Sequence, residues 1–259
     1  GNAVNEFEEE FKKIANSKYA IGVGSGTDAL FLSLKALGIK EGDEVITTPY
    51  TFYATIGAIV TAGATPKFVD IGEDYNIDPN LIEDSITPLT KAIVPVHWSG
   101  LICDMDSIRD IADRHKLSIV EDACHAINAK RNDKTAGSIG DTACFSMHPL
   151  KNLNVWGDGG VIVTNNKELH DKLVLLRNHG LRDRDICDVF AYNSRLDTLQ
   201  AIVGNHYIKK VDHITNMRIK NAHFYDKVLS ALPQIKIPHR SSTIKQVFHL
   251  YCIRVSRRD

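Results

Sequence analysis

Residues 117–125 read Leu-Ser-Ile-Val-Glu-Asp-Ala-Cys-His, a short apolar run that ends in two acids. A run of this length, bounded by polar residues, predicts a buried strand. Six further β-rich runs occur in the chain, and helical patterns stand between them. Strands that alternate with helices in this way predict a mainly parallel seven-stranded sheet that is covered by helices on both faces.

The remaining elements follow from the same periodicities. The seven predicted strands cover residues 19–23, 44–48, 67–71, 92–96, 118–120, 142–146 and 161–164. The helical patterns cover residues 28–37, 51–62, 104–115 and 167–178. An amphipathic helix is predicted before the first strand, where Val4, Phe7, Phe11 and Ile14 recur at helical spacing. Beyond the last strand, residues 194–232 predict one long helix and residues 247–255 a final strand.

The bulk composition narrows the class of protein. With 259 residues and 43% hydrophobic content, the chain is long enough to bury the core of a large α/β domain. The 31 Lys+Arg and 32 Asp+Glu leave a net charge of -1, which gives no field for nucleic acid or an anionic membrane. Five cysteines without a C-x-x-C pair predict free thiols in a reducing, cytoplasmic setting. No apolar run has the length of a membrane span, and no signal peptide is expected.

The pattern also predicts two parts of unequal size. Residues 1–200 are expected to form the large α/β domain, and residues 201–259 a linking helix and the beginning of a small C-terminal domain. Gly1 leads almost directly into a helix, and the final strand has nothing after it to complete a layer. We therefore expect a fragment of a longer protein.

The first candidate site lies after the first strand. In an open parallel sheet the ligand lies beyond the carboxyl ends of the strands. Gly24-Ser25-Gly26-Thr27 stands between a strand and a helix, where free N–H groups and the helix dipole hold a phosphate. Ordinary turn chemistry is an equally frequent reason for such glycines. The segment is neither a Walker loop nor, with Thr27 in the last position, the dinucleotide fingerprint.

Two further loops carry groups that suit a flat, aldehyde-bearing ring. Asp122 should emerge at the end of its strand, where a carboxylate can pair with a protonated ring nitrogen, although helix capping is the commoner role. Lys151 lies in a loop where most lysines are solvated, but a desolvated lysine amine can form a Schiff base and move protons. Ser146 could bind the same phosphate, and Phe52 offers an aromatic face.

Histidine is frequent, with eleven in the chain, yet no H-E-x-x-H or comparable ligand spacing accompanies them. A metal site is therefore not expected. His125 stands apart because it lies three residues after Asp122 and would face the same ligand.

Together these segments resemble the DegT/StrS-type (DegT/DnrJ/EryC/StrS) sugar aminotransferases, a branch of the fold-type-I pyridoxal-phosphate enzymes. Several motifs in the right order are more specific than any one of them. The motifs are Ser25-Gly26-Thr27-Asp28-Ala29-Leu30, Gly42-Asp43-Glu44-Val45-Ile46, Thr51-Phe52-Tyr53-Ala54-Thr55, Glu121-Asp122-Ala123, Phe145-Ser146 through Lys151, Gly157-Asp158-Gly159-Gly160, Asn178-His179-Gly180 and Tyr192-Asn193-Ser194-Arg195.

The resemblance implies roles for individual residues around pyridoxal 5'-phosphate. Lys151 resembles the lysine that carries the cofactor and shuttles the proton, and Asp122 resembles the partner of the pyridinium nitrogen. Phe52 matches the residue stacked on the ring. His125 matches the position near the phenolic oxygen of the ring.

The phosphate of the cofactor has its own set of residues in the resembled family. Gly26, Thr27 and Ser146 match the cradle within one subunit. Asn193 corresponds to a residue that reaches the phosphate of the neighbouring subunit. The resemblance therefore implies a homodimer with a shared active site.

The activity that the resemblance implies is transfer of an amino group from L-glutamate to a keto-sugar, either nucleotide-linked or a keto-sugar phosphate. Cell-surface polysaccharide or amino-sugar biosynthesis is the usual setting. The sequence departs from the family at Asp158, where glutamate is usual, and at both ends, where the family continues. Lys151 separates the chain from related dehydratases, which have histidine at that position.

Two alternatives remain open. A nicotinamide (NAD)-dependent oxidoreductase is suggested by Gly22-Val23-Gly24-Ser25-Gly26 between a strand and a helix, and it gives Lys151 no role. A non-catalytic or truncated pyridoxal-phosphate-binding relative is suggested by the ends that the family has and this chain lacks. It predicts binding of the cofactor without turnover.

Overall fold

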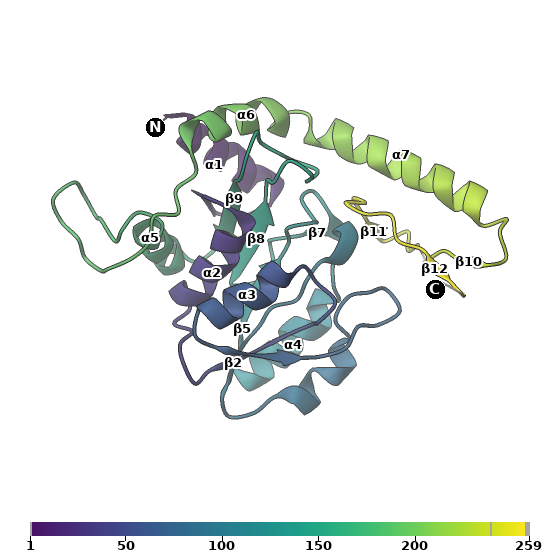
Figure 1. The fold of residues 1–259 in the computed structure, drawn as a ribbon, viewed down its shortest axis with the longest axis horizontal. Helices are drawn as coiled ribbons and strands as arrows, with labels where there is room; N and C mark the ends of the chain where they lie inside the picture. Colours follow the sequence, from purple (N-terminus) through teal and green to yellow (C-terminus); the bar gives the residue numbers. More distant parts are fainter. Residues whose placement is uncertain (1, 239, 257–259) are drawn as a thin grey trace.

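The computed structural model describes residues 2–238 and 240–256 (Figure 1). Its centre is a seven-stranded sheet in the order β1-β9-β8-β5-β4-β2-β3. Only β9 runs against its neighbours β1 and β8, and every other pair is parallel. The predicted sheet is confirmed. Its strands are β1 (Tyr19–Val23), β2 (Glu44–Thr47), β3 (Thr65–Phe68), β4 (Thr90–Ile93), β5 (Ser118–Asp122), β8 (Thr142–Ser146) and β9 (Gly160–Thr164).

Helices cover both faces of this sheet (Figure 1). They are α1 (Asn2–Ile14), α2 (Gly26–Ala36), α3 (Tyr53–Thr61), α4 (Met105–His115), α5 (Lys167–Leu176), α6 (Thr198–Ile208) and α7 (Val211–Leu229), with short 3-10 turns η1 (Pro79–Leu81), η2 (Glu83–Ser85) and η3 (Trp98–Gly100). Small strands complete the chain: β6 (Lys130–Arg131), β7 (Lys134–Thr135) and β11 (Ile244–Lys245) form one sheet, and β10 (Ile235–Lys236) pairs with β12 (Arg254–Val255).

Successive residues of β9 show why the strands read as continuous apolar runs. Val161 and Val163 belong to the core on one side of the sheet, which includes Phe11 of α1. Ile162 belongs to the core on the other side, with Leu30 of α2. Because both faces are buried, neither can carry the alternating polar residues of a half-exposed strand.

The predicted long helix over residues 194–232 is wrong in one respect, because the chain breaks it into α6 and α7. The Lys210 N–H donates to Tyr207 O at 2.8 Å, a tightened turn that ends the first helix. Ile208 and Val211 on either side of the break are both buried. The break lets both side chains enter the core while the rest of α7 projects away from the sheet (Figure 1).

The predicted strand over residues 247–255 is also largely wrong, since only Arg254–Val255 is a strand. Residues 247–249 instead lie across the turn η3, where Val247 N and His249 N donate to Gly100 O and Ser99 O, each at 3.0 Å. The turn offers no continuous row of partners, and Phe248 takes a φ of 47°, outside the strand region. We call residues 246–252 the strap.

No helix in the described ranges combines the length and the apolar character that a membrane span needs. The division into a large domain over 1–200 and the start of another over 201–259 stays a prediction.

Candidate functional site

A cavity of about 470 Å³ lies where the carboxyl ends of β1, β5 and β8 meet. This is the edge of the sheet that the strand order predicts for a ligand. Seven of the eight site residues predicted from the sequence line it, namely Gly26, Thr27, Phe52, Asp122, His125, Ser146 and Lys151. Asn193 does not.

The start of α2 forms the first wall of this cavity. Ser25 caps the helix, because its Oγ accepts a hydrogen bond from Asp28 N at 3.0 Å. Gly26 is the first helical residue, and a Cβ there would lie 2.7 Å from Ser146 Cβ. Only glycine lets the helix start approach the end of β8 this closely. The free amides of the first turn therefore open beside the Ser146 hydroxyl, an arrangement that suits a phosphate.

Gly22, which suggested a dinucleotide turn, lies inside β1 instead. It pairs with Val161 in the register of the sheet. A Cβ on Gly22 would lie 3.0 Å from the Leu196 side chain. Packing between strand and loop therefore explains Gly22, which is not part of the turn between β1 and α2.

Asp122 is the most tightly held polar group of the cavity. Its Oδ2 accepts from Thr55 Oγ1 at 2.7 Å, and its Oδ1 accepts from Cys124 N at 3.2 Å. Its backbone N–H donates to Pro95 O, and its carbonyl accepts from His97 N. The side chain is only 5% exposed. A carboxylate with donors on both oxygens has a fixed plane.

Glu121, which precedes Asp122 in β5, forms a buried pair with His97. Glu121 Oε2 and His97 Nε2 lie 2.9 Å apart, and both side chains are fully buried. His97 Nδ1 accepts from Cys103 N, so its Nε2–H is the donor to Glu121. Burial alone would raise the pKa of Glu121, but the His97 hydrogen bond and the amides of Gly140 and Gly137 hold that pKa below its usual value.

Lys151 stands on a loop of different character. Its backbone N–H donates to His148 O at 2.8 Å, and its side chain is partly exposed. Leu150 beside it is 73% exposed. The next residue, Asn152, anchors the loop to the strap, because its buried Nδ2 donates to Val247 O at 2.9 Å.

His125 is a neutral donor in this setting. Its ring lies between Trp98 and His249, with ring centroids 5.2 and 4.1 Å away. Burial, with Lys151 and His249 adding positive charge, lowers the pKa of His125 to about 2. Its Nδ1 accepts from Ser99 N at 3.4 Å, so the single proton lies on Nε2.

Thr55 and His249 line the cavity but are not among the eight site residues predicted from the sequence. Thr55 follows Thr51 by four positions at the start of a predicted helix, and that spacing was the available signal. His249 comes from the strap, far away in the sequence, and burial, followed by Lys151 and Arg218, lowers its pKa to about 4. No local pattern points to it, because only the tertiary fold brings it to the cavity.

Asn193 lies outside the cavity on an exposed segment. It forms a bridge with Asn178, whose Oδ1 accepts from Arg195 Nη1 at 2.7 Å. The neighbouring Ser194 O accepts from Gly24 N at 2.9 Å. The segment is thus tied to the loop that leads into α2, with the Asn193 side chain exposed. Its reach into another subunit stays a prediction.

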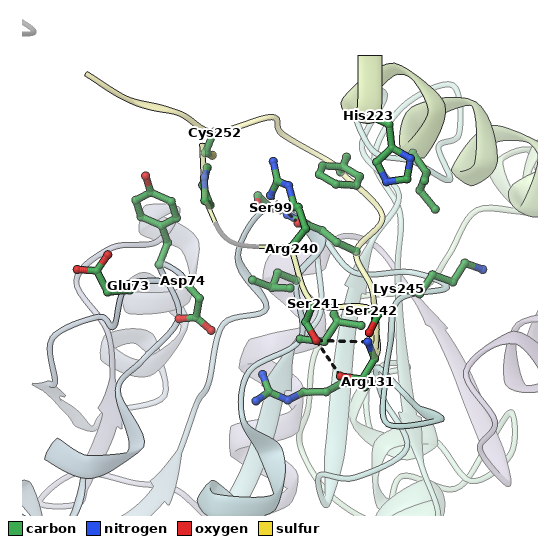
Figure 2. A pocket seen from close by; sticks show the side chains of 18 of the residues that line it. Glu73, Asp74, Ser99, Arg131, His223, Arg240, Ser241, Ser242, Lys245 and Cys252 are labelled. Atoms are coloured by element: carbon green, nitrogen blue, oxygen red, sulfur yellow. Dashed lines mark hydrogen bonds between the residues drawn. The ribbon is translucent and has the colours of Figure 1, made fainter. Parts of the chain in front are cut away.

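A larger hollow of about 770 Å³ lies on the other side of the strap, beside α7 (Figure 2). Two arginines that line it form ion pairs, Arg240 with Asp226 and Arg254 with Glu73. None of the eight predicted residues lines it. Size alone does not make it the better candidate, because it lacks the convergence of lysine, carboxylate and helix start.

The family model of the DegT/DnrJ/EryC1/StrS aminotransferases matches residues 1–259. A "pleiotropic regulatory protein" of Geobacillus stearothermophilus is 43% identical, over 100% of this chain and 70% of its own length. A dTDP-3-amino-3,4,6-trideoxy-alpha-D-glucose transaminase of Streptomyces venezuelae is 42% identical, over 100% of this chain and 69% of its own length.

Solved structures agree with the sequence relatives. The S. venezuelae protein DesV, in complex with a ketimine intermediate, is 42% identical with a TM-score of 0.97, over 100% of this chain and 70% of that one. A Bacillus subtilis protein with bound cofactor PMP is 36% identical with a TM-score of 0.90, over 98% of this chain and 59% of that one.

Proposed function

Because the chain belongs to the DegT/DnrJ/EryC1/StrS aminotransferase family, we propose that its 470 Å³ cavity is the site of a pyridoxal-phosphate-dependent transfer of an amino group to a keto-sugar. One observation carries the proposal. Lys151, Asp122 and the start of α2 come from distant parts of the sequence and line a single cavity. We further propose L-glutamate as the amino donor.

The residues present fit the cofactor group by group. The amides at the start of α2, with Thr27 and Ser146, offer donors to its phosphate. Asp122 would accept from the ring nitrogen, Lys151 would bind the aldehyde, and Phe52 would lie against the ring. When bound, pyridoxal phosphate supplies an electron sink for the carbanion that forms beside the amino group.

The protein's own groups then divide the work. Asp122, held on both oxygens, would keep the proton on the ring nitrogen. The Lys151 amine, once released, would act as the acid and base that moves the proton in each half-reaction. His125, neutral and protonated on Nε2, would donate to the phenolic oxygen of the ring.

The substrate class is proposed from the named relatives. They include enzymes for a dTDP-linked and a UDP-linked amino sugar and a protein of spore coat polysaccharide biosynthesis. We propose a nucleotide-linked keto-sugar, or a keto-sugar phosphate, in cell-surface polysaccharide or amino-sugar biosynthesis. The homodimer, with Asn193 of one subunit at the phosphate of the other, and the cytoplasmic location belong to the same proposal.

The visible absorption spectrum tests this function. The protein is incubated with pyridoxal phosphate and dialysed, L-glutamate is added, and the experiment is repeated with Lys151→Ala. We expect a bound chromophore that borohydride fixes to Lys151 and that L-glutamate bleaches, while Lys151→Ala gives neither covalent fixation nor turnover. A wild-type protein that acquires no chromophore would contradict the proposal.

A non-catalytic pyridoxal-phosphate-binding protein is the second candidate, since a relative 43% identical to the chain is named as a regulatory protein. The same experiment separates the two. A chromophore that neither L-glutamate nor any other amino donor bleaches, in the presence or absence of keto-sugars, would favour the second candidate.

A further inference from the structure

A chain of hydroxyl groups reaches Asp122 from the turn that carries Phe52. Thr51 Oγ1 and Thr55 Oγ1 lie 2.8 Å apart, and Thr55 Oγ1 lies 2.7 Å from Asp122 Oδ2. Thr55 is 1% exposed, so water does not compete for its hydroxyl. Thr55 lies in the first turn of α3, and Thr51 lies one helical turn before it.

Donor chemistry fixes the direction of this chain. An ionised carboxylate can only accept hydrogen bonds, and a threonine hydroxyl has one hydrogen to donate. Thr55 must therefore give its hydrogen to Asp122, and its own oxygen accepts from Thr51. The order of donation is Thr51 to Thr55 to Asp122.

The consequence is a carboxylate with a defined orientation. Thr55 holds Oδ2 and the Cys124 amide holds Oδ1, so the side chain cannot rotate without breaking a buried hydrogen bond. The remaining lone pairs are left for a ring nitrogen. Thr51 directly precedes Phe52, so the same chain links the residue under the ring nitrogen to the turn that would cover the ring.

We propose that Thr55 is a positioning residue that orients Asp122 toward the ring nitrogen of the cofactor, and that Thr51 extends this control to the turn of Phe52. This inference rests on the proposed function. Neither threonine needs to touch the sugar for this role. Their loss should therefore affect cofactor binding and the chemical step far more than binding of the keto-sugar.

Two substitutions of Thr55 separate the hydroxyl group from the volume of the side chain. Thr55→Val removes the hydroxyl with little change in volume, and Thr55→Ser keeps it. Thr47→Val is the matched control, because Thr47 is also fully buried and donates at 2.9 Å, but to Val94 O and not to Asp122. The measurements are the dissociation constant of pyridoxal phosphate, kcat and KM for the keto-sugar, and the Tm of the apoprotein.

For Thr55→Val we expect the dissociation constant to rise roughly tenfold and kcat to fall roughly 10- to 100-fold, with KM for the keto-sugar within about threefold, since a hydrogen bond to a charged group is lost. Thr55→Ser should restore both values to within about threefold. Thr47→Val should lower Tm and leave the dissociation constant and kcat unchanged.

Three outcomes overturn the inference. Wild-type values for Thr55→Val would remove the positioning role while leaving the proposed function intact. Equal losses in Thr55→Val and Thr47→Val would assign Thr55 to general stability. If Thr55→Val does not fold, Thr51→Val should raise the dissociation constant about threefold, and no change there would refute the chain. A wild-type protein that binds no pyridoxal phosphate would refute the proposed function itself.

Discussion

The two sides of the cavity are built in opposite ways. The Asp122 side, which we call the fixed side, consists of strand ends and a helix start, and its Asp122 and Thr55 side chains, with the neighbouring Glu121–His97 pair, are buried and hydrogen-bonded. The Lys151 side, which we call the loop side, is a loop in which residues 148–151 are partly or largely exposed, whereas Asn152 after them is buried. The fixed side suits a group that must hold one orientation. The loop side suits an amine that must bind, leave and transfer a proton.

The comparison predicts its largest effect at Lys151. Lys151→Ala should lower kcat by about 10²- to 10⁴-fold, because it removes the group that we propose to move the proton. The unfolding midpoint in urea should change little, since the side chain is partly exposed. Steady-state kinetics and urea unfolding of the same preparation give both numbers. A large loss of stability would mean that the loop side is structural as well.

On the fixed side, Gly26→Ala should lower the stability of the fold, in contrast to Lys151→Ala. The added Cβ would meet Ser146 Cβ at 2.7 Å and Cys124 Sγ at 3.1 Å, so α2 must move away from β8. We expect a loss of stability of about 1–3 kcal/mol from overpacking. Affinity for pyridoxal phosphate should fall as well. Urea unfolding and a fluorescence titration with the cofactor check both, with Gly57→Ala as the control, because nothing lies within 4 Å of a Cβ there.

Lowering the pH should weaken the fixed side through His125. The folded protein keeps this ring neutral, with a pKa of about 2, whereas the unfolded chain binds a proton near pH 6.5. The stabilising contribution is therefore complete above pH 6.5 and decreases as the pH falls. From pH 6.5 to 5 the loss is at most about 2 kcal/mol for this one proton.

His125→Asn isolates that effect. Urea unfolding of the wild type and the variant at pH 7 and pH 5 gives two differences, and we expect the variant to lose less stability on acidification. The His249 ring lies 4.1 Å from His125 and has its own lowered pKa of about 4, so the variant His249→Asn is measured in parallel to separate the two contributions. Equal acid sensitivity would show that His125 is not held in its neutral form by the fold.

The smallest effect is expected where the loop side is anchored. Asn152→Ala removes the bond from Nδ2 to Val247 O and should cost about 1 kcal/mol of stability, leaving a buried carbonyl without its donor. The kcat should fall only slightly. If kcat falls as far as in Lys151→Ala, the position of Lys151 depends on this anchor, and the loop side is as strictly fixed as the Asp122 side.

Much of the fold is readable in the sequence because its strands are buried on both faces. The predicted bounds of β1 and β8 agree with the structure. The break between α6 and α7 was missed because apolar residues continue at helical spacing through it, and only the core around Ile208 and Val211 decides where the helix ends. The strand predicted over residues 247–255 is largely absent because these residues have the sequence pattern of a strand but lie beside the turn η3, which offers no continuous row of hydrogen-bond partners.

The site divides in the same way. Asp122 ends β5 and Lys151 lies in the loop after β8, so the topology of a parallel sheet brings them together once the strands are identified. Thr55 and His249 depend on distances between elements, which no periodicity encodes. The directly encoded residues are those proposed to touch the cofactor, whereas Thr55 acts on one of them.

The strap has a thermodynamic consequence. Its residues contribute His249 to the 470 Å³ cavity on one side and Gln246 and Phe248 to the larger hollow on the other. Consider a ligand that binds the cavity more tightly when the strap is in place than when the strap is loosened. By linkage, such a ligand lowers the population of molecules with a loosened strap. Backbone amides around the larger hollow, including those on α7, would then exchange their hydrogens with solvent more slowly when the smaller cavity is filled, although no ligand touches them.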